Sequence, residues 1–127
     1  MYLMKRKKEM GRQAEDLAAQ FLQSKGWRVI DRNWACHVGE LDLVLHRGDT
    51  TLFVEVRSTV RGDLDTLHHT VNRTKQRKVA GAAEVWLTTH PTYLGTCRFD
   101  VLTLKFDENG HSRIRHYPDA FQSPWAF

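Results

Sequence analysis

Apolar side chains recur at helical spacing in the first part of the chain. The spacing predicts an amphipathic helix over residues 9–25, with a buried stripe made of Ala14, Leu17, Ala18, Phe21 and Leu22. Glu15 lies three residues before Ala18, so it falls at the border of this stripe. Gly26 is the expected stop, because glycine readily adopts the left-handed conformation that ends many helices.

The next part of the chain alternates between apolar and polar residues, as half-buried strands do. It predicts three strands, at residues 27–34, 40–46 and 52–57. Gly48-Asp49, between the second and third strands, suits a two-residue type II′ turn. One face of the resulting hairpin carries the apolar residues Leu41, Leu43, Leu45, Leu52, Val54 and Val56.

The second half of the chain repeats this change from helical to strand periodicity. It predicts a polar loop at 58–69, a helix at 71–88, a strand at 98–106, and an Asn109-Gly110 type I′ turn into a strand ending near Tyr117. His68 and His69 are interpreted as solvated residues of the loop. The order α-β-β-β-α-β-β is typical of an α/β fold, with helices packed on a mixed β-sheet.

The predicted hairpin places two acidic residues opposite each other. With the two-residue loop, Asp42 faces Glu55 and Glu40 faces Arg57, all on the polar face. Opposed residues have Cβ atoms about 4.5–5.5 Å apart, and like charges there destabilise a sheet. A shared proton, a nearby cation or a bound metal would offset the repulsion. An ordinary charge ladder on an exposed hairpin explains the same residues, and a register shift of one residue would separate them.

Length and composition limit the class of protein. A chain of 127 residues with 41% hydrophobic residues suits a single domain over residues 1–127, with a basic segment at 1–8 that could be flexible and an unpatterned tail at 118–127. No apolar stretch approaches the roughly 20 residues of a spanning helix, and the basic N-terminus lacks the apolar region of a secretory signal. Cys36 and Cys97 are isolated, so a reduced, cytoplasmic protein without a zinc site is expected.

Positive charge is concentrated in two clusters. The net charge is +4, and the clusters consist of Lys5, Arg6, Lys7 and Lys8, and of Arg73, Lys75, Arg77 and Lys78. Such clusters neutralise phosphate backbones with little regard to sequence, so both are candidates for binding nucleic acid. Solvated helix ends are the alternative explanation.

Several segments carry a resemblance to a known superfamily. The core of PD-(D/E)XK nucleases, Asp…(Glu)-x-Lys, resembles Gly39-Glu40-Leu41-Asp42-Leu43-Val44 followed by Phe53-Val54-Glu55-Val56-Arg57. More closely, the chain resembles the YraN family of small bacterial proteins, whose pattern runs Gly-Glu-Ile-Asp-Leu-Ile and then Phe-Val-Glu-Val-Lys. The likeness covers nearly all of the chain, including Gly11 to Gly26 with Glu15, Arg32-Asn33, Lys75, Arg98-Phe99-Asp100-Val101 and Ala120-Phe121.

The resemblance implies a restriction-endonuclease-like fold, similar to that of archaeal Holliday-junction resolvases. It implies that Glu15, Asp42 and Glu55 hold a divalent metal, Mg²⁺ or Mn²⁺. Where the family has a lysine that aids the attacking water, this chain has Arg57. Arginine stays protonated and cannot be a general base, but it can stabilise charge on a phosphoryl group. Lys75 could take the lysine's part, or it could simply extend along apolar neighbours.

Two functions from different classes fit these residues. The first is a metal-dependent endonuclease that hydrolyses DNA, including branched or structured DNA; the second is a non-catalytic nucleic-acid-binding module that retains the nuclease fold. The three acids favour the first and Arg57 favours the second. A structural adaptor that binds no nucleic acid is a third hypothesis. A homodimer and the choice of DNA or RNA stay open, and no membrane partner is expected.

Overall fold

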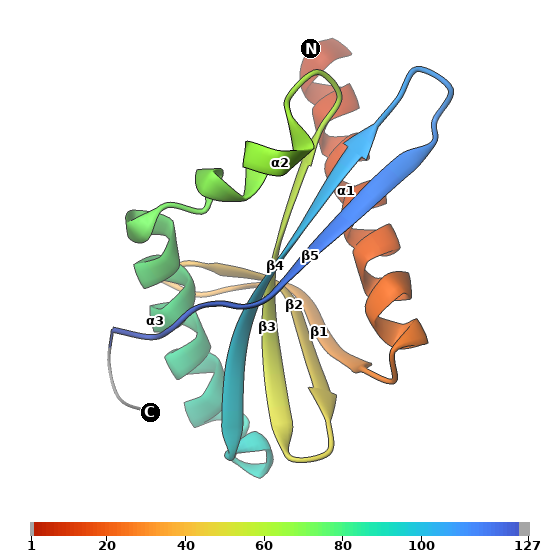
Figure 1. Ribbon diagram of the computed structural model, residues 1–127. Helices are drawn as coiled ribbons and strands as arrows, with labels where there is room; N and C mark the ends of the chain where they lie inside the picture. The colour runs from red at the N-terminus through yellow and green to blue at the C-terminus, as the bar shows by residue number, and fades with distance from the viewer. Residues whose placement is uncertain (1, 125–127) are drawn as a thin grey trace.

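The computed structural model describes residues 2–124, with side chains from residue 6 onward. Helices and strands follow the predicted order (Figure 1). The main elements are α1 (Tyr2–Ser24), β1 (Arg28–Ala35), β2 (Glu40–Arg47), β3 (Thr50–Thr59), α2 (Leu64–Leu67), η1 (His68–Thr70), α3 (Arg73–Thr89), η2 (Pro91–Tyr93), β4 (Thr96–Phe106) and β5 (Ser112–Phe121). The basic stretch before residue 9 therefore belongs to α1, and the end of the tail, 125–127, lies outside the described residues.

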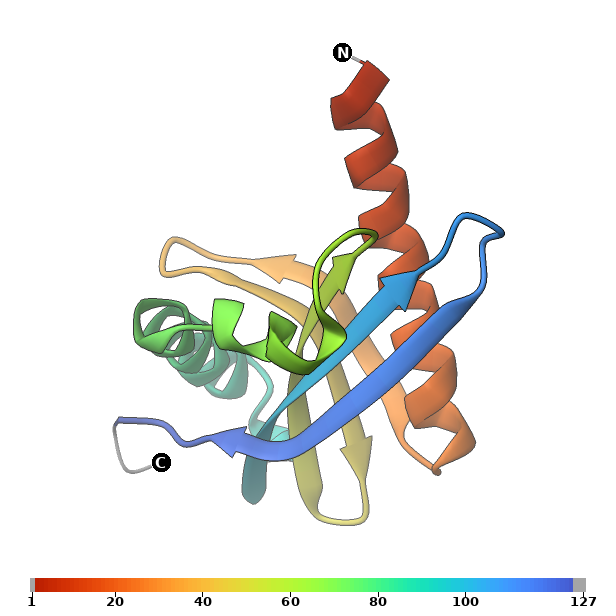
Figure 2. The same ribbon diagram turned by 45° about the horizontal axis from the view of Figure 1, so that its top comes forward.

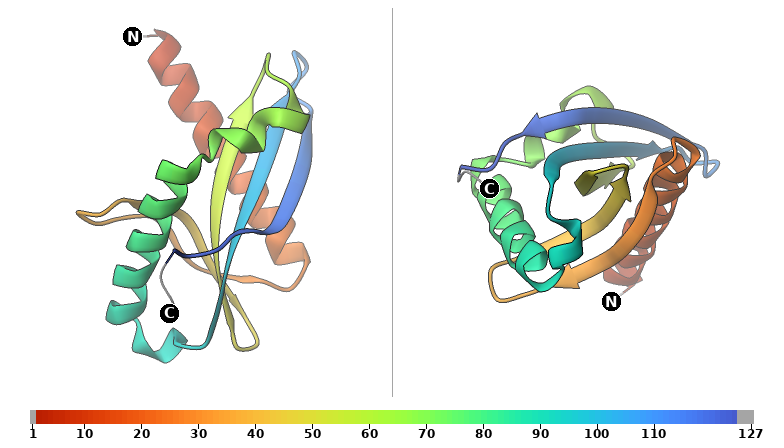
Figure 3. Two further views of the ribbon diagram at one scale, coloured as in Figure 1. Left: turned by 60° about the vertical axis from the view of Figure 1, so that its left-hand side comes forward. Right: turned by 90° about the horizontal axis from the view of Figure 1, so that it is seen from below.

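A five-stranded mixed sheet forms the centre of the fold, in the order β1-β2-β3-β4-β5. The β3–β4 pair is parallel and the other pairs are antiparallel, which confirms the predicted mixed sheet. The two long helices cover opposite faces of the sheet (Figure 3). Helix α3 packs Val79, Ala83 and Trp86 on one face, and α1 packs Ala18 and Leu22 on the other. Both faces are therefore buried at the sheet centre, and polar residues there need partners.

The β2–β3 hairpin has the predicted turn and register. Gly48 adopts φ +63°, as the first position of a type II′ turn requires, and the strands pair from Arg47–Thr50 to Leu43–Val54. The ladder ends there. Glu40 pairs with Ala35 of β1 instead, so the predicted cross-strand pair of Glu40 and Arg57 is wrong.

The end of the ladder coincides with a bend in β1 and β2. Asn33 has φ +50°, a left-handed conformation that is uncommon outside glycine. Beyond it, Leu41 packs in the core under α3, whereas Leu43 and Leu45 pack under α1. The prediction that these leucines share one face is therefore wrong at Leu41. The bend also carries the β1–β2 tip toward α3 (Figure 2).

The second half differs from the prediction in four places. The expected loop at 58–69 contains α2, which Asp63 caps, and the start of η1. Helix α3 begins at Arg73, because the Asn72 side chain accepts a hydrogen bond from the Lys75 N–H and so acts as its N-cap. Strand β5 continues to Phe121 and thus includes part of the expected tail. The type I′ turn is wrong as well, because of its two central residues only Gly110 has positive φ.

Two simpler expectations concern helix ends and membranes. Gly26 adopts φ +91° just after α1, which confirms it as the stop. None of the helices in residues 2–124 is long and apolar enough to cross a membrane.

Candidate active site

Strand β3 places Glu55 in the middle of the sheet. Its side chain is 2% exposed, because α3 covers this face and because neighbouring strands flank it. In the parallel register, Glu55 lies beside Val101 of β4. A carboxylate at such a position loses its hydration and needs compensation from its neighbours.

Asp42 lies where β2 separates from β3. Its Oδ2 accepts a hydrogen bond of 2.9 Å from the Val56 N–H. The Asp42 side chain thus bonds the main chain of β3 just beyond Leu43–Val54, the last pair of the ladder. The two acids therefore meet, as the hairpin argument predicted, although through a bend rather than a regular ladder pair. Burial, together with the negative charge of Asp42, raises the pKa of Glu55 to about 8. Burial also raises the pKa of Asp42, against the opposing effect of the Val56 N–H.

Two cations approach Glu55 without saturating it. Arg57 Nη2 lies 3.6 Å and Lys75 Nζ 3.9 Å from Glu55 Oε2, both beyond a good hydrogen bond. Both side chains are about one-third exposed, so they also reach solvent. Arg57 and Lys75, the two candidates for the place of the family lysine, therefore both lie beside the same carboxylate.

The first helix brings a third acid to the edge of this pair. Glu15 is half-buried, as its place on the apolar stripe predicted. Burial raises the pKa of Glu15; the Asn33 side chain lowers it and the nearby Asp42 raises it. Asn33 thus touches the site from the bend in β1. From the sequence, Asn33 was recognised only within the matching pair Arg32-Asn33 and had no predicted role in the site, where its backbone is left-handed.

Unsatisfied polar atoms collect at this place. Five buried side-chain nitrogen or oxygen atoms in the described residues lack a hydrogen-bond partner, and four of them are Glu15 Oε1, Glu55 Oε1, Arg57 Nε and Thr103 Oγ1. Thr103 lies beside Arg57 on β4, and sequence reasoning missed it. Most buried polar groups in proteins are paired, so such a concentration marks a site that is completed by something else.

The donor set fits a hard divalent cation. Mg²⁺ prefers oxygen ligands, keeps several waters, and needs only one or two carboxylates beside substrate phosphates. Asp42 and Glu55 supply such a pair, and Glu15 lies alongside. Within residues 6–124, no group of three or more His, Cys, Asp and Glu side chains is arranged to hold a metal by itself. The geometry suits a cation shared with water and phosphate better than a closed protein cage.

The two basic clusters lie on α1 and α3, the helices that also carry Glu15 and Lys75. On α3, Arg73, Arg77 and Lys78 are exposed and Lys75 is half-buried against Glu55. On α1, the exposed part of the cluster is Arg6, Lys7 and Lys8, and the side chain of Lys5 lies outside the described residues. Glu15 is seven positions from Lys8, about 10 Å along a helix.

Comparison with known proteins gives a consistent result. Residues 14–104, more than half of the chain, match the family described as "Uncharacterised protein family UPF0102". The chain belongs to the UPF0102 family. A UPF0102 protein of Myxococcus xanthus is 38% identical over 117 residues, covering 92% of both chains. A UPF0102 protein of Pseudomonas syringae pv. syringae is 39% identical over 119 residues, covering 92% of this chain and 96% of the relative. Family membership confirms the resemblance seen in the sequence and leaves the reaction to be inferred from the site.

Proposed function

We propose that this UPF0102 protein is a metal-dependent nuclease that hydrolyses phosphodiester bonds in DNA. The observation that carries the proposal is the cluster of unsatisfied buried polar atoms around Glu55, beside a second acid and two solvent-reaching cations. Asp42 and Glu55 would hold Mg²⁺ or Mn²⁺, with Glu15 at their edge. Bound there, such an ion supplies Lewis acidity to a phosphodiester and makes a water more acidic.

The remaining residues have separate tasks in this proposal. Arg57 is a permanent cation, and its exposed edge can stabilise negative charge that develops on a phosphoryl group. Lys75 contributes a compact ammonium beside the same oxygen of Glu55 that Arg57 approaches. Asn33 orients Glu15 through its side chain. The exposed arginines and lysine of α3 hold the DNA backbone near the acids.

A non-catalytic DNA-binding module is the second candidate, and one observation favours it. Arg57 stands where the family pattern has a lysine, and its guanidinium is larger and differently directed than an ammonium. A pure binder, however, gains nothing from buried acids beside the path of a phosphate, because they repel it and destabilise the fold. The acids are the reason to prefer the enzyme.

A cleavage assay separates the two candidates. The purified protein is incubated with single-stranded, duplex and four-way DNA, with Mg²⁺ and with Mn²⁺. We expect metal-dependent cleavage that Glu55→Gln abolishes and that the matched control Glu84→Gln retains, since Glu84 is an exposed glutamate on α3. DNA binding without cleavage under all conditions would instead establish the binding module.

The basic residues of α3 can be tested independently of cleavage. Replacing Arg73, Arg77 and Lys78 by glutamate should remove most of the affinity for duplex DNA, and the native affinity should fall steeply as salt rises. The measurement is a salt series of fluorescence-anisotropy titrations. An affinity that changes neither with salt nor with these substitutions would mean that DNA does not bind at the basic residues of α3.

A further inference from the structure

A pocket of about 530 Å³ lies next to the candidate active site. It is formed where the end of β5 passes η1 and the start of α3; these segments converge on the left of Figure 2. Its lining includes the side chains of His68, Val71, Asn72, Gln76, Val101 and Tyr117. The volume is within the range of small-molecule sites, about 300–1,000 Å³.

The pocket adjoins the acids but does not contain them. Val101, part of its lining, is the β4 neighbour of Glu55. Gln76, another part of its lining, follows Lys75 directly on α3. A group bound in the pocket would therefore lie one strand away from the phosphodiester assigned to Asp42 and Glu55.

The pocket offers an aromatic face. Tyr117 stacks on His68 with 4.2 Å between ring centroids and 23° between the planes. His68 in turn lies 4.0 Å from the ring of His69. The expectation that His68 is a solvated loop residue is therefore wrong, since it is half-buried and stacked. Planar heterocycles bind such surfaces by stacking, whatever their identity.

Polar groups at its rim match the edge of a heterocycle. The Gln76 Nε2 donates to the Val71 carbonyl at 2.9 Å, which leaves its Oε1 as an acceptor. The Asn72 Oδ1 caps α3, which leaves its amide N–H₂ as a donor. His68 Nδ1 is the fifth buried polar atom without a partner in the described part of the chain. Together these groups provide a hydrogen-bond donor and an acceptor for the edge of a heterocycle.

Charge separates this pocket from its neighbour. Its lining contains no Asp, Glu, Lys or Arg. Of its three histidines, His116 already bonds Asp100, and the rings of His68 and His69 contact each other, so the pocket suits a neutral ring better than a phosphate. A second cleft of about 260 Å³ shares Gln76 and is lined by Arg73 and Arg77. A neutral aromatic pocket beside a cationic cleft matches the two halves of a nucleotide, its base and its phosphate.

We propose that the pocket of Tyr117, His68 and Gln76 receives one unpaired nucleobase of the DNA strand that is cleaved. The substrate class is then DNA with unpaired nucleotides, since a base inside a duplex cannot reach such a pocket. The inference rests on the proposed function for the position of the phosphodiester, and it adds the specificity of the same site.

The test compares two duplexes that differ in one nucleotide. One carries a single unpaired 2-aminopurine as a bulge and the other is fully paired, and Ca²⁺ replaces Mg²⁺ so that the DNA is not cut. We expect the bulged duplex to bind about tenfold tighter, with quenched 2-aminopurine fluorescence, because stacking of one base contributes on the order of a tenfold gain or more. Tyr117→Ala should remove this preference and leave the affinity for the paired duplex unchanged.

Two further variants keep the test valid if Tyr117→Ala fails to fold. Tyr117→Phe keeps the stacking ring and should keep the preference for the bulged duplex. Gln76→Leu keeps a side chain of similar size but removes the polar group, so it should weaken that preference. Tyr93→Ala is the matched control, since Tyr93 is also half-buried against the α3 core but lies at the other end of that helix.

The outcomes separate this inference from the proposed function. Equal binding of both duplexes, or an equal loss for both in Tyr117→Ala, would overturn the base pocket while salt-dependent duplex binding still supports a DNA-binding site. If a free nucleoside binds the pocket but bulged DNA gains nothing, the pocket serves a small molecule and the inference is overturned. Failure to bind either duplex would remove both proposals.

Discussion

Two buried carboxylates on adjacent strands have opposite surroundings. Asp100 on β4 is fully buried and accepts hydrogen bonds on both oxygens, from Arg98 Nε (2.9 Å) and Nη2 (2.8 Å), His116 Nε2 (2.6 Å) and the Asp119 N–H (2.9 Å). Glu55 on β3 is almost as buried, yet its cations stand at 3.6 and 3.9 Å and its Oε1 has no partner within the described residues. Burial alone therefore does not distinguish the two sites, but completeness of pairing does.

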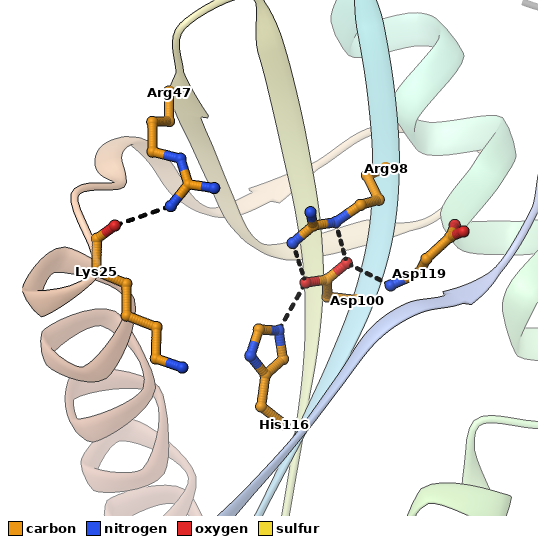
Figure 4. Close-up of polar contacts among 6 residues, drawn as sticks. All are labelled: Lys25, Arg47, Arg98, Asp100, His116 and Asp119. Carbon is orange, nitrogen blue, oxygen red and sulfur yellow. Dashed lines mark hydrogen bonds and ion pairs between the residues drawn. The ribbon is translucent and has the colours of Figure 1, made fainter.

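Asp100 joins Arg98, His116 and Asp119 in a structural cluster, called the clasp below. Its partners come from β4 and from β5, where His116 lies in the regular ladder and Asp119, with φ +50°, lies in the irregular stretch that follows (Figure 4). Its hydrogen bonds outweigh the effect of burial, and the pKa of Asp100 is lowered. The same figure shows Arg47 donating to the Lys25 carbonyl at 2.8 Å, which ties the end of α1 to the β2–β3 hairpin. Both carboxylate oxygens of Asp100 therefore have partners within the fold itself.

The contrast between Asp100 and Glu55 shows that the fold is destabilised at Glu55, where a buried carboxylate is incompletely paired. A buried carboxylate that is paired keeps its charge, whereas one left incomplete holds its proton to higher pH. Glu55 does the latter, and its proton can be shared with Asp42. Perturbed acids of this kind collect at functional sites, where a ligand completes them.

The largest effect is expected at the clasp. Asp100→Asn should lower the free energy of unfolding by about 3–5 kcal/mol, because it leaves the Arg98 charge without its partner. Since the pKa of Asp100 is lowered, the loss should be full above about pH 4 and shrink as the pH falls below the value of an ordinary aspartate. Urea denaturation across pH measures it. Asp16→Asn, which removes an exposed ion pair with Arg32, is the control and should cost at most about 1 kcal/mol. Equal costs for both variants would contradict the clasp.

The next effect concerns Arg57 at the incomplete site. Arg57→Ala should lower the metal-dependent cleavage rate about a hundredfold if its side chain stabilises charge on the phosphoryl group. Arg57→Lys should preserve or raise the rate, because it restores the ammonium of the family pattern. Single-turnover cleavage rates of the native protein, Arg57→Ala and Arg57→Lys on one DNA substrate measure both effects. If all three proteins cleave equally while Glu55→Gln is inactive, Arg57 has no catalytic part and Lys75 is the residue to vary.

Glu55 should show the opposite sign of stability change from Asp100. Because its pKa is raised from 4.5 to about 8, the native state binds more protons than the unfolded state between these values, so stability falls as the pH rises through this window. Glu55→Gln removes the ionisation and should stabilise the metal-free protein by on the order of 2 kcal/mol at pH 8, with a smaller difference at pH 5. Thermal unfolding at both pH values measures the difference. A variant that is less stable than the native protein at pH 8 would mean that the charge of Glu55 is already compensated.

Glu15 should show a weaker form of the same effect. It is half-buried, its pKa is raised by burial, and solvent screens part of the interaction. Glu15→Gln should therefore stabilise the protein above pH 5 by less than Glu55→Gln does. Parallel thermal unfolding of the two variants tests the ranking. A larger gain at Glu15 would move the centre of the site from the hairpin to the first helix.

The sequence predicted those parts of the site that depend on local rules. Gly48-Asp49 determined the hairpin register, and the register brought Asp42 and Glu55 together. The helical stripe likewise placed Glu15 at the buried edge of α1. The bend at Asn33 could not be predicted, because it depends on how the β1–β2 tip packs on α3: a Cβ at Gly39 would come within 3.0 Å of the Lys78 carbonyl.

Other features depended on contacts between distant segments. The Glu40–Arg57 pair assumed a ladder that continues, whereas Asp42 ends it by bonding the Val56 N–H. The pocket at Tyr117 joins the end of β5 to η1, where the sequence predicted the end of a strand with an unpatterned tail and, separately, a polar loop. The position of Thr103 beside Arg57 follows from the β3–β4 pairing, which is parallel and therefore set by no local turn.

A calorimetric titration of Mn²⁺ tests most directly whether Asp42 and Glu55 hold a divalent cation, as proposed. At pH 7, below the pKa of about 8, Glu55 is largely protonated, so binding should release roughly one proton. The observed heat should therefore differ between buffers with different ionisation enthalpies. Glu84→Gln should behave as the native protein does, and Glu55→Gln should lose both the binding and the buffer dependence. Mn²⁺ binding that survives unchanged in Glu55→Gln, or no binding to the native protein, would contradict the claim.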